Sequence, residues 1–220
     1  MNHHFKNRVH AGRQLATRLM GYAKRDDVVV LALPRGGVPV AFEIAVALEV
    51  PLDVFLVRKL GVPGREELAM GAIAAGGIRV LQEDVVDYLG ISDVAIERIA
   101  AREQREIDRQ AEVYREDRPA RSIRGKTVIV VDDGLATGST MHAAIDAIRK
   151  QHPAQVVVAV PVAPLATYRD FQSLADEIVS VIVPQELDGV GRWYEDFSQI
   201  SDDEVRFLLK EAESLSRFRI

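Results

Sequence analysis

Two adjacent carboxylates followed by a loop of glycine and hydroxyl residues form the part of this chain best suited to chemistry. In order, the residues are Asp132, Asp133, Gly134, Leu135, Ala136, Thr137, Gly138, Ser139 and Thr140. Apolar residues at 128–131 precede them, which predicts a buried strand that ends at the aspartates. The two carboxylates can accept hydrogen bonds from ribose hydroxyls. The loop's backbone N–H groups, at the start of a following helix, can hold a phosphate group.

Adjacent carboxylates repel each other, so the aspartates need positive charge or hydroxyl donors nearby. Cations follow two other apolar runs: Arg35, with Gly36 and Gly37, comes after 28–33, and Arg58 with Lys59 comes after 53–57. An arginine fork matches phosphate oxygens, and glycines allow a ligand to approach the backbone closely. Both groups are therefore candidates for phosphate binding. The alternative interpretations are a plain turn and a pair of solvated cations.

A second candidate is the aromatic segment at 190–197, which holds Trp193, Tyr194 and Phe197 in a polar surrounding. A flat heterocycle could stack on Trp193. The alternative is that these rings form a small hydrophobic core of their own.

Strand and helix patterns alternate along the chain, which favours a parallel sheet with helices on both faces. Strands are expected at 28–33, 53–57, 127–131, 156–160 and 178–183, and a hairpin at 70–81. Helices are expected at 8–24, 38–50, 92–117, after the loop at 132–140, at 165–175 and from Ser201 onward. Two glycines, one proline and mixed charges at 60–67 predict a mobile loop. Because ligands bind beyond the carboxyl ends of parallel strands, Arg35, Lys59 and Asp132 are expected in one cleft.

The composition sets outer limits on function. The chain has 220 residues, 48% of them hydrophobic, a length and composition typical of one globular domain. Its net charge of −5 and the lack of a Lys/Arg-rich tract argue against nucleic-acid or anionic-membrane partners. The chain has no cysteine, which excludes disulfides and thiolate metal sites and fits a cytoplasmic location. Neither a signal peptide nor an apolar run long enough to span a membrane is evident.

The string at 132–140 resembles the phosphoribosyl-diphosphate (PRPP) binding signature of type I phosphoribosyltransferases almost residue for residue, and 34–37 stands where that family binds pyrophosphate. The segments 58–75 and 193–197 look like a bacterial group of these enzymes whose acceptor is unassigned. The resemblance implies a single α/β domain over 1–220. Its Rossmann-like parallel-sheet core would span about 24–183. A small hood would be formed by the N-terminal segment and about 184–220, and a lid by about 60–69.

The implied activity is transfer of the 5-phosphoribosyl group from PRPP to a nitrogen acceptor, with Mg²⁺ as cofactor and release of pyrophosphate. The resemblance implies that Asp132 and Asp133 bind the ribose and, through PRPP and water, Mg²⁺. It implies that residues 136–140 bind the 5′-phosphate. The implied pyrophosphate-binding residues are Arg35, Gly36, Gly37, Arg58 and Lys59. The resemblance assigns the acceptor to Trp193 and Tyr194. Asp132, Asp133, Arg35 and Lys59 are the candidate catalytic residues. A homodimer is expected only because relatives often form one.

One position departs from part of the family. Ala136 stands where relatives of the hypoxanthine type carry an aspartate that handles the proton of the base. Alanine cannot do this, so the proton of the acceptor must go elsewhere. The alternative function is a regulator that senses PRPP without turning it over. Such proteins usually act on nucleic acid through a basic surface, and the acidic composition of this chain disfavours that hypothesis.

Overall fold

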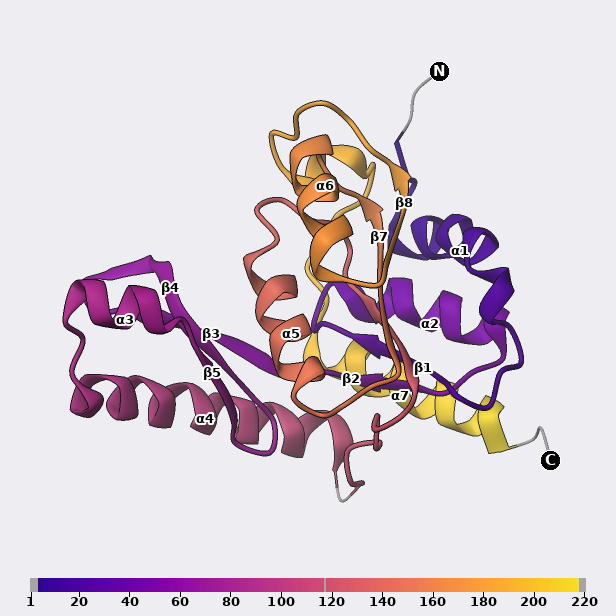
Figure 1. Cartoon of the computed structure of the whole chain (residues 1–220). Coiled ribbons are helices and arrows are strands. Elements are labelled where there is room, and N and C mark those ends of the chain that lie inside the picture. Colours follow the sequence, from indigo (N-terminus) through magenta and orange to yellow (C-terminus); the bar gives the residue numbers. More distant parts are fainter. Residues whose placement is uncertain (1–3, 117, 218–220) are drawn as a thin grey trace.

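The computed structural model describes residues 4–116 and 118–217. A five-stranded parallel sheet lies at the centre, in the order β2–β1–β6–β7–β8 (Figure 1). Its strands are β1 (Val28–Ala32), β2 (Leu52–Val54), β6 (Thr127–Val131), β7 (Gln155–Val162) and β8 (Glu177–Ile182). The parallel sheet flanked by helices confirms the predicted α/β fold.

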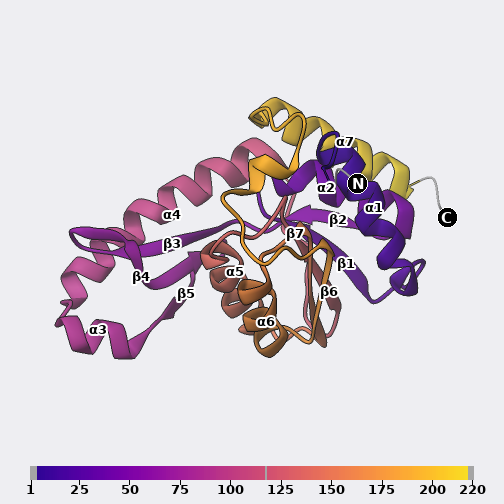
Figure 2. The same ribbon diagram turned by 90° about the horizontal axis from the view of Figure 1, so that it is seen from above.

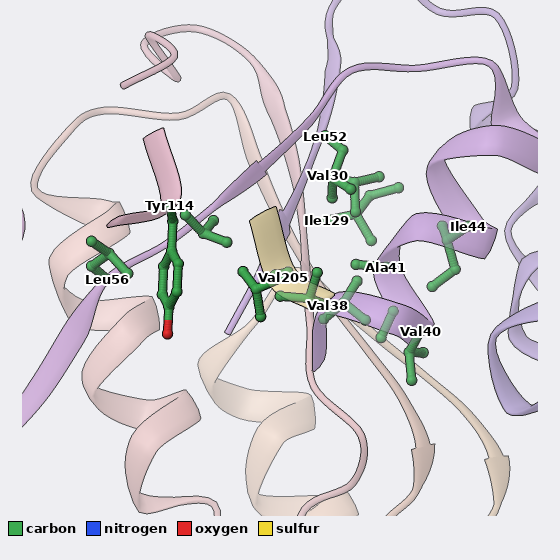
Figure 3. Close-up of a cluster of buried hydrophobic side chains, with 14 of the residues drawn as sticks. Val30, Val38, Val40, Ala41, Ile44, Leu52, Leu56, Tyr114, Ile129 and Val205 are labelled. Atoms are coloured by element: carbon green, nitrogen blue, oxygen red, sulfur yellow. The ribbon is translucent and has the colours of Figure 1, made fainter. Parts of the chain in front are cut away.

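The central strands are apolar throughout because both faces of the sheet are covered. Val28, Val30 and Ala32 of β1 point into one core, and Val29 and Leu31 point into the other. Successive residues of a strand face opposite sides, so a strand buried on both sides needs a continuous apolar run. Figure 3 shows part of the first core, where side chains of β1, α2, β6 and α7 meet.

Helices form the two outer layers. On one face lie α1 (Arg8–Arg18), α2 (Gly37–Leu48) and α7 (Asp202–Arg217), and on the other lie α5 (Ser139–Arg149) and α6 (Leu165–Leu174) (Figure 2). Two short 3₁₀ helices are also present: η1 (Met20–Tyr22) follows α1, and η2 (Val190–Trp193) precedes α7. No helix in the part of the chain that the structure describes is long and apolar enough to cross a membrane.

A second, antiparallel sheet extends away from the core and forms what we call the arm, residues 57–115 (Figure 1). The arm comprises β3 (Val57–Val62), β4 (Arg65–Ala74), β5 (Ile78–Leu81), α3 (Glu83–Leu89) and α4 (Asp93–Arg115). Helix α4 packs along β3 and β4, and α5 packs against all three strands.

The arm corrects two expectations. The segment 53–57 is not one strand, because β2 ends at Val54 and β3 begins a different sheet at Val57. The expected loop over 60–67 is instead mostly strand, because β3 and β4 pair across a turn at 63–64, whereas a lid over 60–69 stays a prediction. The glycines were typical of a loop, but the hairpin itself needs glycine where its strands lie close together: a Cβ on Gly61 would lie 2.7 Å from the carbonyl oxygen of Glu66. Helix α3 was not predicted.

The N-terminal segment pairs with the segment before α7, and we use the word hood for residues 4–8 and 184–200. The backbone N–H of Phe5 donates to the carbonyl of Trp193 at 2.8 Å, and that of Glu195 donates to the carbonyl of Phe5 at 2.8 Å. Phe5 and Tyr194 are both buried in a small separate cluster. This pairing brings an N-terminal segment to the carboxyl edge of the parallel sheet.

Candidate active site

Helix α6 supports the loop between β6 and α5. The hydroxyl of Thr167 donates to the carbonyl of Ala136 at 2.9 Å. Gly138 has a φ of +74°, and a Cβ on it would lie 2.5 Å from the ring of Phe171. Only glycine combines that left-handed backbone with so close a neighbour. A cavity of about 190 Å³ lies over the loop, lined by Asp132, residues 134–141 and Val190.

The glycines of the first loop lie directly against the aspartates. A Cβ on Gly36 would come within 2.1 Å of Oδ2 of Asp133, and one on Gly37 within 2.6 Å of the carbonyl oxygen of Val131. The peptide bond between Pro34 and Arg35 is cis. The two loops meet because β1 and β6 are parallel neighbours that end together. The predicted pyrophosphate and ribose candidates are thus adjacent in space.

The two aspartates have different surroundings. Burial and the charge of Asp133 raise the pKa of Asp132 well above its usual range. Burial also raises the pKa of Asp133, although the hydrogen bond and charge of Arg8 oppose that shift. One oxygen of Asp132 accepts from the backbone N–H of Asp133 at 2.8 Å. Asp132 is therefore the carboxyl of the pair that would gain more from new hydroxyl donors or a cation.

Arg8, at the start of α1, supplies the positive charge that the pair requires. Its Nε donates to Oδ2 of Asp133 at 2.8 Å, and the two side chains are only 9% and 15% exposed. Its Nη1 donates to the carbonyl of Ser198 at 2.8 Å. The guanidinium lies 3.8 Å from the ring centre of Phe197, a cation–π contact. The sequence analysis did not find Arg8.

Arg35 turns toward α7. Its Nη1 lies 3.6 Å from Oδ1 of Asp202, whose other oxygen lies 3.5 Å from Nη1 of Arg109. The hydroxyl of Tyr114 donates to Asp202 at 2.6 Å. The hydrogen bond from that hydroxyl lowers the pKa of Asp202. The charges of the two arginines also lower it, whereas burial opposes the shift. Asp202 is thus an ionised partner for Arg35 at the rim of the site.

Arg58 and Lys59 do not act as a pair. Neighbouring residues of a strand point to opposite faces, and these two lie on β3 of the arm. Nε of Arg58 donates to the buried carboxylate of Glu103 on α4 at 2.8 Å. Lys59 instead lines a cavity of about 220 Å³ together with Thr137, Ser139 and His142. The structure brings Lys59 to the loop that holds Thr137 and Ser139, whereas Arg58 turns toward α4.

The two acceptor candidates also differ. Tyr194 is buried, and its hydroxyl donates to the backbone carbonyl of Asp133 at 2.6 Å. Its ring packs between Phe5 and Phe197, at centre distances of 5.3 Å and 5.0 Å. Tyr194 is therefore a support for the loop and has no free face for stacking. Trp193 is only partly buried and meets the ring of His4 edge-on at 6.0 Å.

The family model for the phosphoribosyl transferase domain matches residues 3–192, most of the chain. The chain belongs to this family. The match includes every element that builds the loops around Asp132 and Arg35. It therefore confirms the predicted resemblance at the level of the domain.

Two relatives of this phosphoribosyl transferase domain are similar over nearly its whole length. The chain is 45% identical over 208 residues to "Putative phosphoribosyl transferase Rv0571c" from Mycobacterium tuberculosis, which covers 94% of this chain and 47% of that protein. The chain thus spans about half the length of the curated relatives it matches. The crystal structure of TT1426 from Thermus thermophilus is 42% identical, covers 94% of this chain and 98% of that one, and has a TM-score of 0.86. At 14% identity and a TM-score of 0.52, the AQ2163 protein from Aquifex aeolicus shares the fold alone.

The family typically uses Mg²⁺, so residues able to hold that ion are expected at the site. Among the described residues, no group of three or more His, Cys, Asp or Glu side chains is arranged to hold a metal. Mg²⁺ usually keeps several waters and takes one or two carboxylates plus substrate phosphates. Asp132, which lines the loop cavity, and its neighbour Asp133 fit that partial donor set.

Proposed function

We propose that this chain transfers the 5-phosphoribosyl group from PRPP to a nitrogen acceptor of small size, such as a nucleobase or related heterocycle, and releases pyrophosphate. The observation that carries the proposal is the cavity over residues 132–140, with a carboxyl at one end and the start of α5 at the other. A phosphate suits the N–H groups and positive dipole at that helix start. A ribose beside it would reach Asp132.

The pyrophosphate of PRPP would lie against Arg35, Gly36 and Gly37, which adjoin the aspartates. Lys59 reaches the outer side of the phosphate loop from the arm. These groups would hold the substrate and stabilise the negative charge that grows on pyrophosphate as its bond to ribose C1 breaks. The nitrogen acceptor then forms the new bond to C1 and releases its proton to water or to the departing pyrophosphate, because Ala136 cannot take it.

Mg²⁺ bound through Asp132, Asp133, water and PRPP oxygens would neutralise charge on the leaving pyrophosphate. The chain's own residues set the position of the sugar. Asp132 would accept hydrogen bonds from its hydroxyls, and the side of the hood nearest the loop, at Val190, would limit access of water. Trp193 remains a proposed acceptor contact, through its less buried edge.

Calorimetry with PRPP and Mg²⁺, followed by a pyrophosphate-release assay over purines, pyrimidines and amines, tests the proposal. We expect wild-type protein to bind PRPP and to release pyrophosphate with at least one acceptor. Asp132→Asn should weaken PRPP binding roughly tenfold or more, because a charged hydrogen-bond acceptor is lost. Asp87→Asn, on the exposed surface of α3, is the matched control and should bind as wild type.

Two results would count against the proposal in different ways. If wild-type protein does not bind PRPP, the substrate assignment is wrong. If it binds PRPP but releases no pyrophosphate above background hydrolysis with any acceptor, the chain is a PRPP-sensing protein and not a transferase.

A further inference from the structure

The buried contacts of Arg8 connect the hood to the sugar site. We propose that Arg8 is a positioning residue that fixes the orientation of Asp133 for ribose recognition and makes it depend on the docking of the hood. This inference rests on the proposed function, because it assigns a role within the same PRPP site.

The geometry around Asp133 leaves its side chain little freedom. Oδ2 accepts from Nε of Arg8 at 2.8 Å, and the absence of a side chain on Gly36 creates the space that this oxygen occupies. The backbone carbonyl of Asp133 accepts from the hydroxyl of Tyr194 at 2.6 Å. Arg8 binds only Oδ2, and we assign the other oxygen, Oδ1, to a ribose hydroxyl.

Two residues of the hood contact Arg8, and a backbone pairing fixes the segment just before it. Its guanidinium donates to the carbonyl of Ser198 and lies over the ring of Phe197. The segment just before it is pinned by the backbone pairing of Phe5 with Trp193. Arg8 is only 8% exposed, although an unpaired arginine would be costly to bury. The arginine is therefore part of a built network in which each member fixes the next.

This arrangement has a consequence for binding. If the hood releases, Arg8 leaves with it, and Asp133 loses both its charge partner and its fixed rotamer. The site would then bind the sugar poorly, while residues 136–138 would keep the support that Thr167 and Phe171 of α6 give them.

The test measures PRPP and inorganic pyrophosphate affinity separately by calorimetry, with Mg²⁺. For Arg8→Gln we expect PRPP to bind roughly ten- to a hundredfold more weakly, because a charged hydrogen bond is lost. Pyrophosphate, which has no ribose, should bind within about twofold of wild type. Arg8→Lys should restore part of the affinity, since it keeps the charge without the fork geometry. Arg13→Gln, which removes an exposed ion pair of the same helix with Glu43, is the matched control and should change neither affinity.

A double-mutant cycle separates positioning from general damage and covers the case in which Arg8→Gln folds poorly. Asp133→Asn removes the charge that Arg8 pairs with, so the double variant contains no unpaired buried charge. If Arg8 acts through Asp133, adding Arg8→Gln to Asp133→Asn should weaken PRPP binding no further.

Three outcomes would overturn the inference. Arg8→Gln binding PRPP within twofold of wild type would remove its basis. Equal loss of PRPP and pyrophosphate binding, or an additive loss in the double variant, would show that Arg8 is merely structural. Wild-type protein that fails to bind PRPP at all would overturn the proposed function first, and this inference with it.

Discussion

The guanidinium of Arg35 lies 3.6 Å from the carboxylate of Asp202, so a residue of the proposed pyrophosphate loop is already paired with an acid from α7. Both side chains are about one-third exposed, at 37% and 33%, and a bound anion can compete for the arginine. The strength of the pair therefore bears directly on how tightly PRPP can bind.

The first prediction concerns this competition. Asp202→Asn should tighten PRPP binding by roughly two- to fivefold, because an exposed ion pair of about 0.2–1 kcal/mol no longer opposes the pyrophosphate. The amide can still accept the hydrogen bond of Tyr114. Calorimetry with PRPP measures the effect. Asp203→Asn is the control, since Asp203 occupies the same first turn of α7 but is 89% exposed and pairs with Arg206 instead. Weaker PRPP binding by Asp202→Asn would contradict the prediction.

The second prediction concerns the floor of the phosphate loop. Gly138 and Gly64 have the same φ of +74°, but only Gly138 has close neighbours, in the ring of Phe171. Gly64→Ala should cost about 1 kcal/mol of unfolding free energy for its backbone alone. Gly138→Ala should cost about 1–3 kcal/mol more, because the new methyl group clashes with the ring. Chemical denaturation measures both.

Adding Phe171→Leu to Gly138→Ala should recover part of the extra loss, because the smaller side chain leaves room for the methyl group. Equal destabilisation by Gly64→Ala and Gly138→Ala would show that the contact with Phe171 does not limit this position.

The third prediction concerns the acid stability of the arm. Burial opposes the ionisation of Glu103, but hydrogen bonds from Arg58 and Arg102 outweigh it and lower the pKa of this carboxyl. A lowered pKa means that the ion pairs stabilise the fold above the unfolded-state value of about 4.3 and that this stability is lost as pH falls through the folded-state value.

Glu103→Gln should therefore be less stable than wild type at neutral pH, by about 1–2 kcal/mol. The difference should shrink below about pH 4. Urea denaturation from pH 7 to pH 3 follows both proteins. Glu97→Gln, whose side chain is 66% exposed on the same helix, should lose far less at neutral pH. A difference that stays constant with pH would rule out the titration of Glu103 as its cause.

The fourth prediction separates the two cations of β3. Lys59→Met should weaken PRPP binding roughly tenfold and slow pyrophosphate release, because Lys59 borders the phosphate loop. Arg58→Met should lower the free energy of unfolding, through loss of its bond to Glu103, with little effect on PRPP affinity. Calorimetry measures the PRPP affinity of both variants, and chemical denaturation measures their free energies of unfolding. Equal loss of PRPP affinity in both variants would contradict the alternation along β3.

The sequence was informative wherever function depends on strand ends. Apolar runs at 28–33 and 127–131 predicted buried strands, and parallel neighbours that end together bring Gly36 and Asp133 into contact. Their proximity followed from topology alone. Their role in binding PRPP remains a prediction.

The contacts that the sequence could not predict are those that depend on tertiary packing. Arg8 meets Asp133 across 125 positions, and no local pattern marks one arginine among many for that contact. The arm was misjudged because its hairpin carries glycines and a proline, as a loop does, and because β2 and β3 are separated by only two residues. Tyr194 was taken for a ligand contact because an aromatic residue in a polar segment has the same appearance whether its ring is free or packed.

The pairing of residues 4–6 with residues 193–196 has a consequence for biosynthesis. The ribosome synthesises the chain from its N-terminus, so Phe5 is made almost two hundred residues before the segment with which it pairs. The loop after β6 rests on α6, so it can form only after residues 165–174 have been made, shortly before Trp193. We therefore expect affinity for the sugar of PRPP to appear only once residues 193–198 have been added to the growing polypeptide.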